Sequence, residues 1–146
     1  MTTINYERNI IGNKYDQVKN LDVKDIAKLI RTDLKQFKDC KFSVSIQRYS
    51  GGRSIHIKLM NTNNLKRFVN VHYNSTDKDR LNFSKDFKER LESIVNQYNY
   101  DKSDPMTDYF NVNFYSHIDI DYNFQKSIED KITDTIDSVT YFTKNN

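Results

Sequence analysis

The fold is decided by residues 21–60, which read LDVKDIAKLIRTDLKQFKDCKFSVSIQRYSGGRSIHIKLM. In the first half of this stretch, apolar residues recur at spacings of three and four, which is the period of one helix face. Asp22 stands where a carboxylate accepts hydrogen bonds from the free amides of a first helical turn. We therefore expect an amphipathic helix over residues 22–38. Its apolar face consists of Val23, Ile26, Ala27, Ile30, Leu34 and Phe37.

The second half of the stretch predicts a β-hairpin. Polar and apolar residues alternate over residues 41–49 and again over 54–59, and a period of two is typical of a half-buried strand. Gly51 and Gly52 lie between the two runs and admit positive φ at both central positions of a tight turn. The apolar face of the hairpin receives the helix and carries Phe42, Val44, Ile46, Ile55, Ile57 and Leu59.

The rest of the chain gives weaker signals. Residues 61–73 fit a strand and a helix about equally well, and we expect a helix of two or three turns there. A clear helix begins near Ser84. Apolar residues at even positions over residues 110–124 predict one long strand, or two strands with a kink at Ser116-His117. Ser127 opens the last helix with a capping-box pattern.

Together these elements predict an α+β fold in a single domain over residues 1–146. The sheet is expected to be small and antiparallel, made of the hairpin and the one long strand. About three helices pack on one of its faces, because each helix and the sheet must bury an apolar side. Residues 1–20 have only a weak helical rhythm and are expected to form a packed N-terminal arm.

Three motifs in this region carry a resemblance to a known family. They are AKLIR at residues 27–31, KFSV at 41–44, and YSGG at 49–52 followed by Ser54-Ile55. In these motifs the chain resembles the twenty-ninth family of large polyvalent-protein-associated domains, over about residues 21–60 and more weakly beyond. The resemblance implies a protein of a phage, plasmid or other mobile element. It assigns no catalytic residue.

The composition of the chain limits the classes of protein to which it can belong. The chain has 146 residues, a net charge of +3, a pI near 8.8 and a mean hydropathy of −0.85, so nucleic-acid binding is allowed but not indicated. The single cysteine, Cys40, excludes an internal disulfide framework. No apolar run reaches the length of a membrane span, and no signal core is evident, so we expect a cytoplasmic protein without a membrane partner or a cofactor. The sequence leaves the oligomeric state open.

One face of the predicted helix is strongly basic. Like charges three and four residues apart repel by a few tenths of a kcal/mol per pair, so the pattern lowers stability. Such a pattern is consistent with an acidic partner, either a protein surface or a nucleic acid. An ordinary solvated helix face is the alternative. This basic stripe consists of Lys24, Lys28, Arg31, Lys35 and Lys38.

Two classes of function follow. The first is a non-enzymatic binding protein, for example an inhibitor of host defence, which docks through the basic stripe and through the polar sheet face and turn. The second is a small metal-dependent or nuclease-like enzyme, because His117, Asp119 and Asp121 alternate along the predicted long strand and are suitable metal ligands. A polar outer sheet face, where Asp and His simply stay solvated, is the explanation of that alternation that we favour. The sheet-face and turn candidates are Ser43, Ser45, Tyr49, Arg53 and His56.

Overall fold

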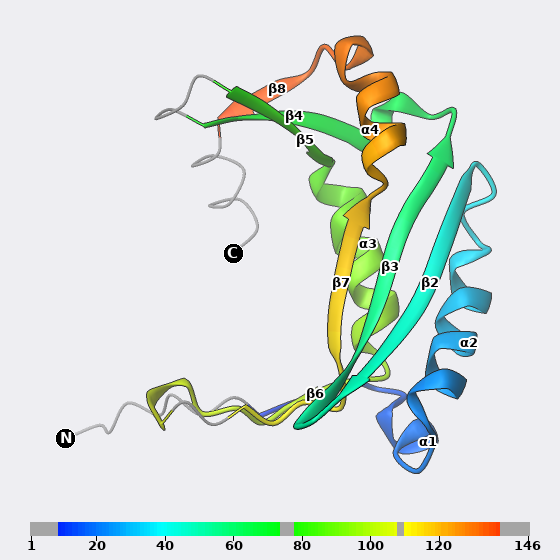
Figure 1. The fold of residues 1–146 in the computed structure, drawn as a ribbon, viewed down its shortest axis with the longest axis vertical. Helices are drawn as coiled ribbons and strands as arrows, with labels where there is room; N and C mark the ends of the chain where they lie inside the picture. Colours follow the sequence, from blue (N-terminus) through cyan, green and yellow to red (C-terminus); the bar gives the residue numbers. More distant parts are fainter. Residues whose placement is uncertain (1–8, 74–77, 108–109, 138–146) are drawn as a thin grey trace.

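The computed structural model describes residues 9–73, 78–107 and 110–137. Within these ranges the chain is a mixed α+β structure with eight strands in three sheets and four α-helices (Figure 1). The helices are α1 (Tyr15–Val18), α2 (Val23–Leu34), α3 (Lys85–Asn96) and α4 (Tyr122–Ile128). The strands are β1 (Ile10–Ile11), β2 (Cys40–Tyr49), β3 (Gly52–Thr62), β4 (Phe68–Tyr73), β5 (Lys78–Phe83), β6 (Tyr100–Asp101), β7 (Tyr115–Ile120) and β8 (Thr135–Asp137). Three short 3-10 turns lie between them: η1 (Leu65–Arg67), η2 (Pro105–Thr107) and η3 (Glu129–Lys131).

The helix and hairpin of residues 21–60 are present as α2, β2 and β3, but α2 ends at Leu34, before the predicted end at Lys38. The hairpin closes at the pair Tyr49 and Gly52. Only Gly51 has a positive φ, of 92°, so the prediction that both glycines need this conformation is wrong. The side chains Ile26, Ile30 and Leu34 of α2 are buried in the same core cluster as the apolar side chains of the hairpin.

The prediction of one small antiparallel sheet is wrong, because β7 pairs with β3 in parallel. The register places Ser54 opposite Tyr115 and Leu59 opposite Ile120, and the sheet has the order β2-β3-β7. A parallel pair needs a long crossover connection, and here the chain between β3 and β7 includes β4, β5 and α3. Alternation of apolar residues shows that a strand is half-buried but carries no information on its direction.

The helix expected over residues 61–73 is also wrong. Residues 68–73 form β4, which pairs with β5 on one side and with β8 in parallel on the other. Aromatic and β-branched side chains favour a strand here, and Phe68 and Val71 are fully buried. The long strand ends early because the carboxylate of Asp121 accepts from the amide of Phe124 (3.1 Å) and so begins α4. Consequently the last helix starts before Ser127.

Helices α2 and α3 pack on one face of the β2-β3-β7 sheet and cover its apolar side chains (Figure 1). The two helices are also joined directly. The Tyr98 hydroxyl, just after α3, donates to the Asp33 carboxylate of α2, and the Gln97 amide donates to the same carboxylate (3.0 Å). Burial, together with the Asp33 charge, raises the pKa of Tyr98. This joint fixes the orientation of α2 and therefore of its basic stripe.

Residues 1–8 of the expected N-terminal arm lie outside the described ranges, and in the part that is described Ile10 and Ile11 are exposed. Strand β1 pairs with β6, and α1 buries Val18 completely. Gly12 comes very close to the end of α3, where its amide donates to the Asn99 carbonyl (2.8 Å). A Cβ atom at this position would lie 2.2 Å from the Asn96 carbonyl oxygen.

The change Gly12→Ala is therefore expected to lower the free energy of unfolding by about 1–3 kcal/mol, because backbone must move to admit the methyl group. Urea denaturation followed by circular dichroism measures this. Gly52→Ala is the control, since its Cβ would first meet ring atoms of Tyr49 and Tyr115 at 3.2 Å, and side chains can turn away. Equal effects of the two changes would refute the role of close backbone approach at Gly12.

Candidate binding surfaces

The face of the β2-β3-β7 sheet opposite the helices is a polar grid. Strand register sets it, because directly paired residues point to the same side of a sheet. Most of these side chains are exposed, and Ser54 is the buried member. From one end to the other, the grid has the rows Gln47–Ser54–Tyr115, Ser45–His56–His117 and Ser43–Lys58–Asp119.

Two histidines lie side by side in the middle row. The rings of His56 and His117 are stacked, with centroids 4.7 Å apart and an interplanar angle of 10°. The Ser54 hydroxyl is 2.9 Å from Nε2 of His56 and fixes the orientation of that ring. Sequence reasoning proposed both histidines for different functions and missed that they are neighbours, because the pair depends on β7 lying beside β3.

The hairpin turn contributes an aromatic pair but not a free cation. Tyr49 is exposed and stacks with Tyr115 at 6.5 Å. Arg53, proposed for partner binding, instead points into the protein. Its Nε donates to the Asn113 carbonyl (2.9 Å), and the same guanidinium contacts the Leu21 carbonyl (3.4 Å). Arg53 thus holds the turn against neighbouring segments.

The three candidate metal ligands do not meet at one point. His117 and Asp119 lie on the outer face of β7, whereas Asp121 caps α4 through the amide of Phe124. Across the part of the chain that the structure describes, no group of three or more His, Cys, Asp or Glu side chains is arranged to hold a metal ion.

The basic stripe lies on α2 and just beyond its end, and all five of its side chains are exposed. Arg31 differs from the four lysines, because its guanidinium donates to the Val44 carbonyl of β2 (2.8 Å). Within the described ranges, Lys24, Lys28, Lys35 and Lys38 make no ion pair. These four ammonium groups are therefore the accessible charges of the stripe.

The four carboxylates in residues 22–39 form no ion pair with the four lysines, and three of them are bound to other side chains. Asp22 pairs with Arg48 of β2, and this hydrogen bond lowers the pKa of Asp22. Asp33 binds Tyr98, and Asp39 binds Arg67. A positive potential therefore remains along the outer side of α2.

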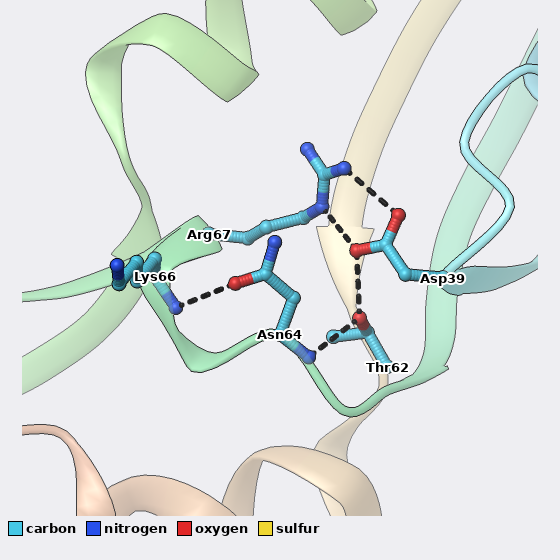
Figure 2. Close-up of polar contacts among 5 residues, drawn as sticks. All are labelled: Asp39, Thr62, Asn64, Lys66 and Arg67. Carbon is cyan, nitrogen blue, oxygen red and sulfur yellow. Dashed lines mark hydrogen bonds and ion pairs between the residues drawn. The ribbon is translucent and has the colours of Figure 1, made fainter.

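The Asp39–Arg67 pair anchors the chain just after α2 (Figure 2). Nε and Nη2 of Arg67 donate to the two carboxylate oxygens at 2.7 and 2.8 Å. The Thr62 hydroxyl donates to the same carboxylate (3.3 Å) and accepts from the Asn64 amide (3.1 Å). The hydrogen bond from Arg67 holds the pKa of Asp39 well below its usual range. The pair fixes the β2 end of the basic stripe to η1.

Comparisons with known proteins give one match. Residues 21–139 match the family model described as large polyvalent protein associated domain 29. No curated protein and no solved structure matches the chain. Among the described helices, none has the length and apolar character needed to cross a membrane.

Proposed function

The chain belongs to the large polyvalent protein associated domain 29 family, and from this premise we propose that it is a non-enzymatic binding protein of a phage or other mobile genetic element. It docks on an acidic partner, which is a nucleic acid or an acidic protein surface. The docking surface is the basic stripe of α2. The stacked Tyr49 and Tyr115 lie on the sheet face opposite the helices and offer a second, apolar area for a protein or a base to cover.

One observation carries this proposal. Of the four lysines of the stripe, Lys24 and Lys28 lie on α2, whereas Lys35 caps its C-terminal end and Lys38 follows it. None of the four has an ion pair with any described carboxylate. Neighbouring lysines on a helix repel one another, whereas an anionic partner would convert that repulsion into attraction. A merely solvated helix would gain stability from i,i+4 pairs of opposite charge.

The test is charge reversal at two lysines of the stripe, Lys28→Glu with Lys35→Glu. Both side chains are exposed, so the fold should change by no more than about 0.5 kcal/mol per site. Binding to a fluorescent random-sequence duplex DNA, and to acidic proteins captured from nuclease-treated bacterial lysate, is expected to fall at least about tenfold, because both partners then meet negative charge. Arg31 stays unchanged, because it holds β2.

Lys66→Glu with Lys131→Glu is the matched control, because both are exposed lysines outside α2 and the change in net charge is the same. This control should retain binding. A DNA partner is indicated by a log-log salt slope near −0.9 per phosphate contact, and a protein partner by a milder effect on the association rate. If the α2 variant and the control bind equally well, the stripe is only a solvated face and the proposal fails.

A further inference from the structure

The two edges of the β2-β3-β7 sheet differ in what lies beside them. At the β2 edge, α2 covers the strand, and Arg31 donates to the outward-facing carbonyl of Val44 (2.8 Å). At the other edge, β7 has β3 as its only strand neighbour in the described structure. An unpaired edge presents a row of main-chain donors and acceptors, which makes it a template for another strand.

The ladder shows which backbone groups of β7 are unpaired. The Asp121 amide donates to the Leu59 carbonyl (2.9 Å), so the odd-numbered residues of β7 face β3. Since alternate residues of a strand bond to opposite sides, N–H and C=O of Ser116, Ile118 and Ile120 point away from β3. No residue in the described ranges bonds to these groups.

This edge opens onto two adjoining cavities, one of about 400 Å³ between β7 and α3 and one of about 420 Å³ toward β6. Ser116 and Asn96 line both, so the two cavities form one groove along the strand. The first cavity has polar walls that include Lys88 and Glu92. Figure 1 shows β4 and β5 beyond one end of β7 and β6 beyond the other.

The second cavity has a more apolar lining than the first, and a separate observation there indicates a binding partner. Ile10 and Phe110 line it, and they are 64% and 63% exposed. Large apolar side chains exposed together beside a groove are typical of an interaction site. Here they lie at the β6 end of the unpaired edge.

We propose that an extended segment of a partner protein binds β7 as an additional strand and places an apolar side chain in the cavity lined by Ile10 and Phe110. The occupant must be an extended main chain, because only regularly spaced N–H and C=O groups match those of Ser116, Ile118 and Ile120. Its side chains alternate, so every second one enters the groove and the others lie beside Tyr115 and His117 on the outer face. This peptide site is separate from the basic stripe and does not depend on it.

The experiment selects ligands for the full chain from a random twelve-residue peptide display library and titrates the synthesised peptide into labelled protein. Amide hydrogen exchange is the main readout. In the free protein, the amides of Ser116 and Ile118 should exchange faster than those of His117 and Asp119, which bond to β3. At saturation, the amides of Ser116 and Ile118 should become protected.

Two variants test the contacts separately. Ser116→Pro removes an outward-facing amide, which an edge strand tolerates, and should weaken peptide binding about tenfold. Ser43→Val, a change at an exposed serine of β2 on the far side of the sheet, should leave peptide binding unchanged. Phe110→Ser changes an exposed side chain, so the protein should fold, and should also weaken the peptide about tenfold.

Three results overturn the proposal. The first is a library that yields no binder. The second is a peptide that leaves the Ser116 and Ile118 amides unprotected or that binds the Ser116→Pro and Phe110→Ser variants as tightly as the parent. The third is a dimeric mass in sedimentation with these amides already protected, which would make a second copy of the chain the occupant.

Discussion

The change Phe87→Ala is expected to lower the free energy of unfolding by about 3–5 kcal/mol. Phe87 projects from α3 and is only 2% exposed. Its ring meets Phe37 and Phe83 edge-on, with centroids 5.3 and 5.5 Å away. Aromatic pairs of this geometry stabilise beyond the area that they bury.

The position of Phe87 explains why the loss is large. Phe37 follows α2, which packs on the β2-β3-β7 sheet, and Phe83 ends β5 in the β4-β5-β8 sheet. One ring thus joins the two larger sheets through α3. Removing it leaves a cavity that neither sheet can fill alone, because each is held in place by its own ladder.

Urea denaturation of the parent and of the variant gives this difference. Tyr122→Ala is the control, since that ring is 67% exposed and its loss should change stability by no more than about 0.5 kcal/mol. Surface substitutions change the free energy of unfolding by up to roughly 1 kcal/mol. A loss for Phe87→Ala that is no larger than this would contradict a core centred on the Phe87 ring.

The elements that sequence predicted correctly are those in which local pattern and tertiary contact agree. In α2 the four-residue spacing of Ile26, Ile30 and Leu34 predicts the helix face that is buried in the core. In the hairpin, the alternation over residues 41–49 and the nearby glycines specify the pairing within one short stretch. Neither element needs information from distant parts of the chain.

The elements that sequence predicted wrongly depend on distant partners. Residues 68–73 are a strand because β5 and β8 lie on either side, and a short apolar run alone does not distinguish a strand from a helix. The direction of β7 is set by the crossover through α3. The early end of β7 could have been predicted from the local sequence, because Asp121 has the position and chemistry of a helix N-cap.

The same distinction between local pattern and distant contact applies to the residues of the candidate binding surfaces. Exposure of Lys28 and Lys35 follows from the helical pattern, because the opposite stripe fills the core. The internal roles of Arg31 and Arg53 do not follow, since their partners Val44 and Asn113 become neighbours only in the fold. The unpaired edge of β7 is likewise a property of strand order, which no single segment encodes.

The change Arg67→Met is expected to lower the free energy of unfolding by about 2–4 kcal/mol at neutral pH, because it leaves a partly buried carboxylate without its counter-ion. The side chains of Arg67 and Asp39 are 15% and 27% exposed. The guanidinium also lies over the Phe87 ring, 4.4 Å from its centroid. Methionine keeps much of the apolar stem, so the loss reports mainly on the charge.

Arg90→Met is the matched control. The Arg90 guanidinium lies over the Phe37 ring at 4.6 Å, but the side chain is exposed and forms no ion pair with a described carboxylate. A cation over an aromatic ring at an exposed site contributes about 0.5–1 kcal/mol, so this loss should be small. Comparable losses in the two variants would show that stacking, and not the pair with Asp39, is what Arg67 contributes.

The pH dependence of the Arg67→Met loss separates the charge from packing. Arg67 holds the pKa of Asp39 below its ordinary value of 3.8, so the folded protein binds this proton more weakly than the unfolded chain does. The stabilisation is therefore fully present above about pH 4 and is lost as the pH falls through the lower pKa of the folded state. The difference in unfolding free energy between the parent and Arg67→Met should shrink as the pH falls below about 4, whereas the Arg90→Met difference should stay constant. A pH-independent loss for Arg67→Met would mean that Asp39 does not need Arg67 to stay ionised in the folded protein.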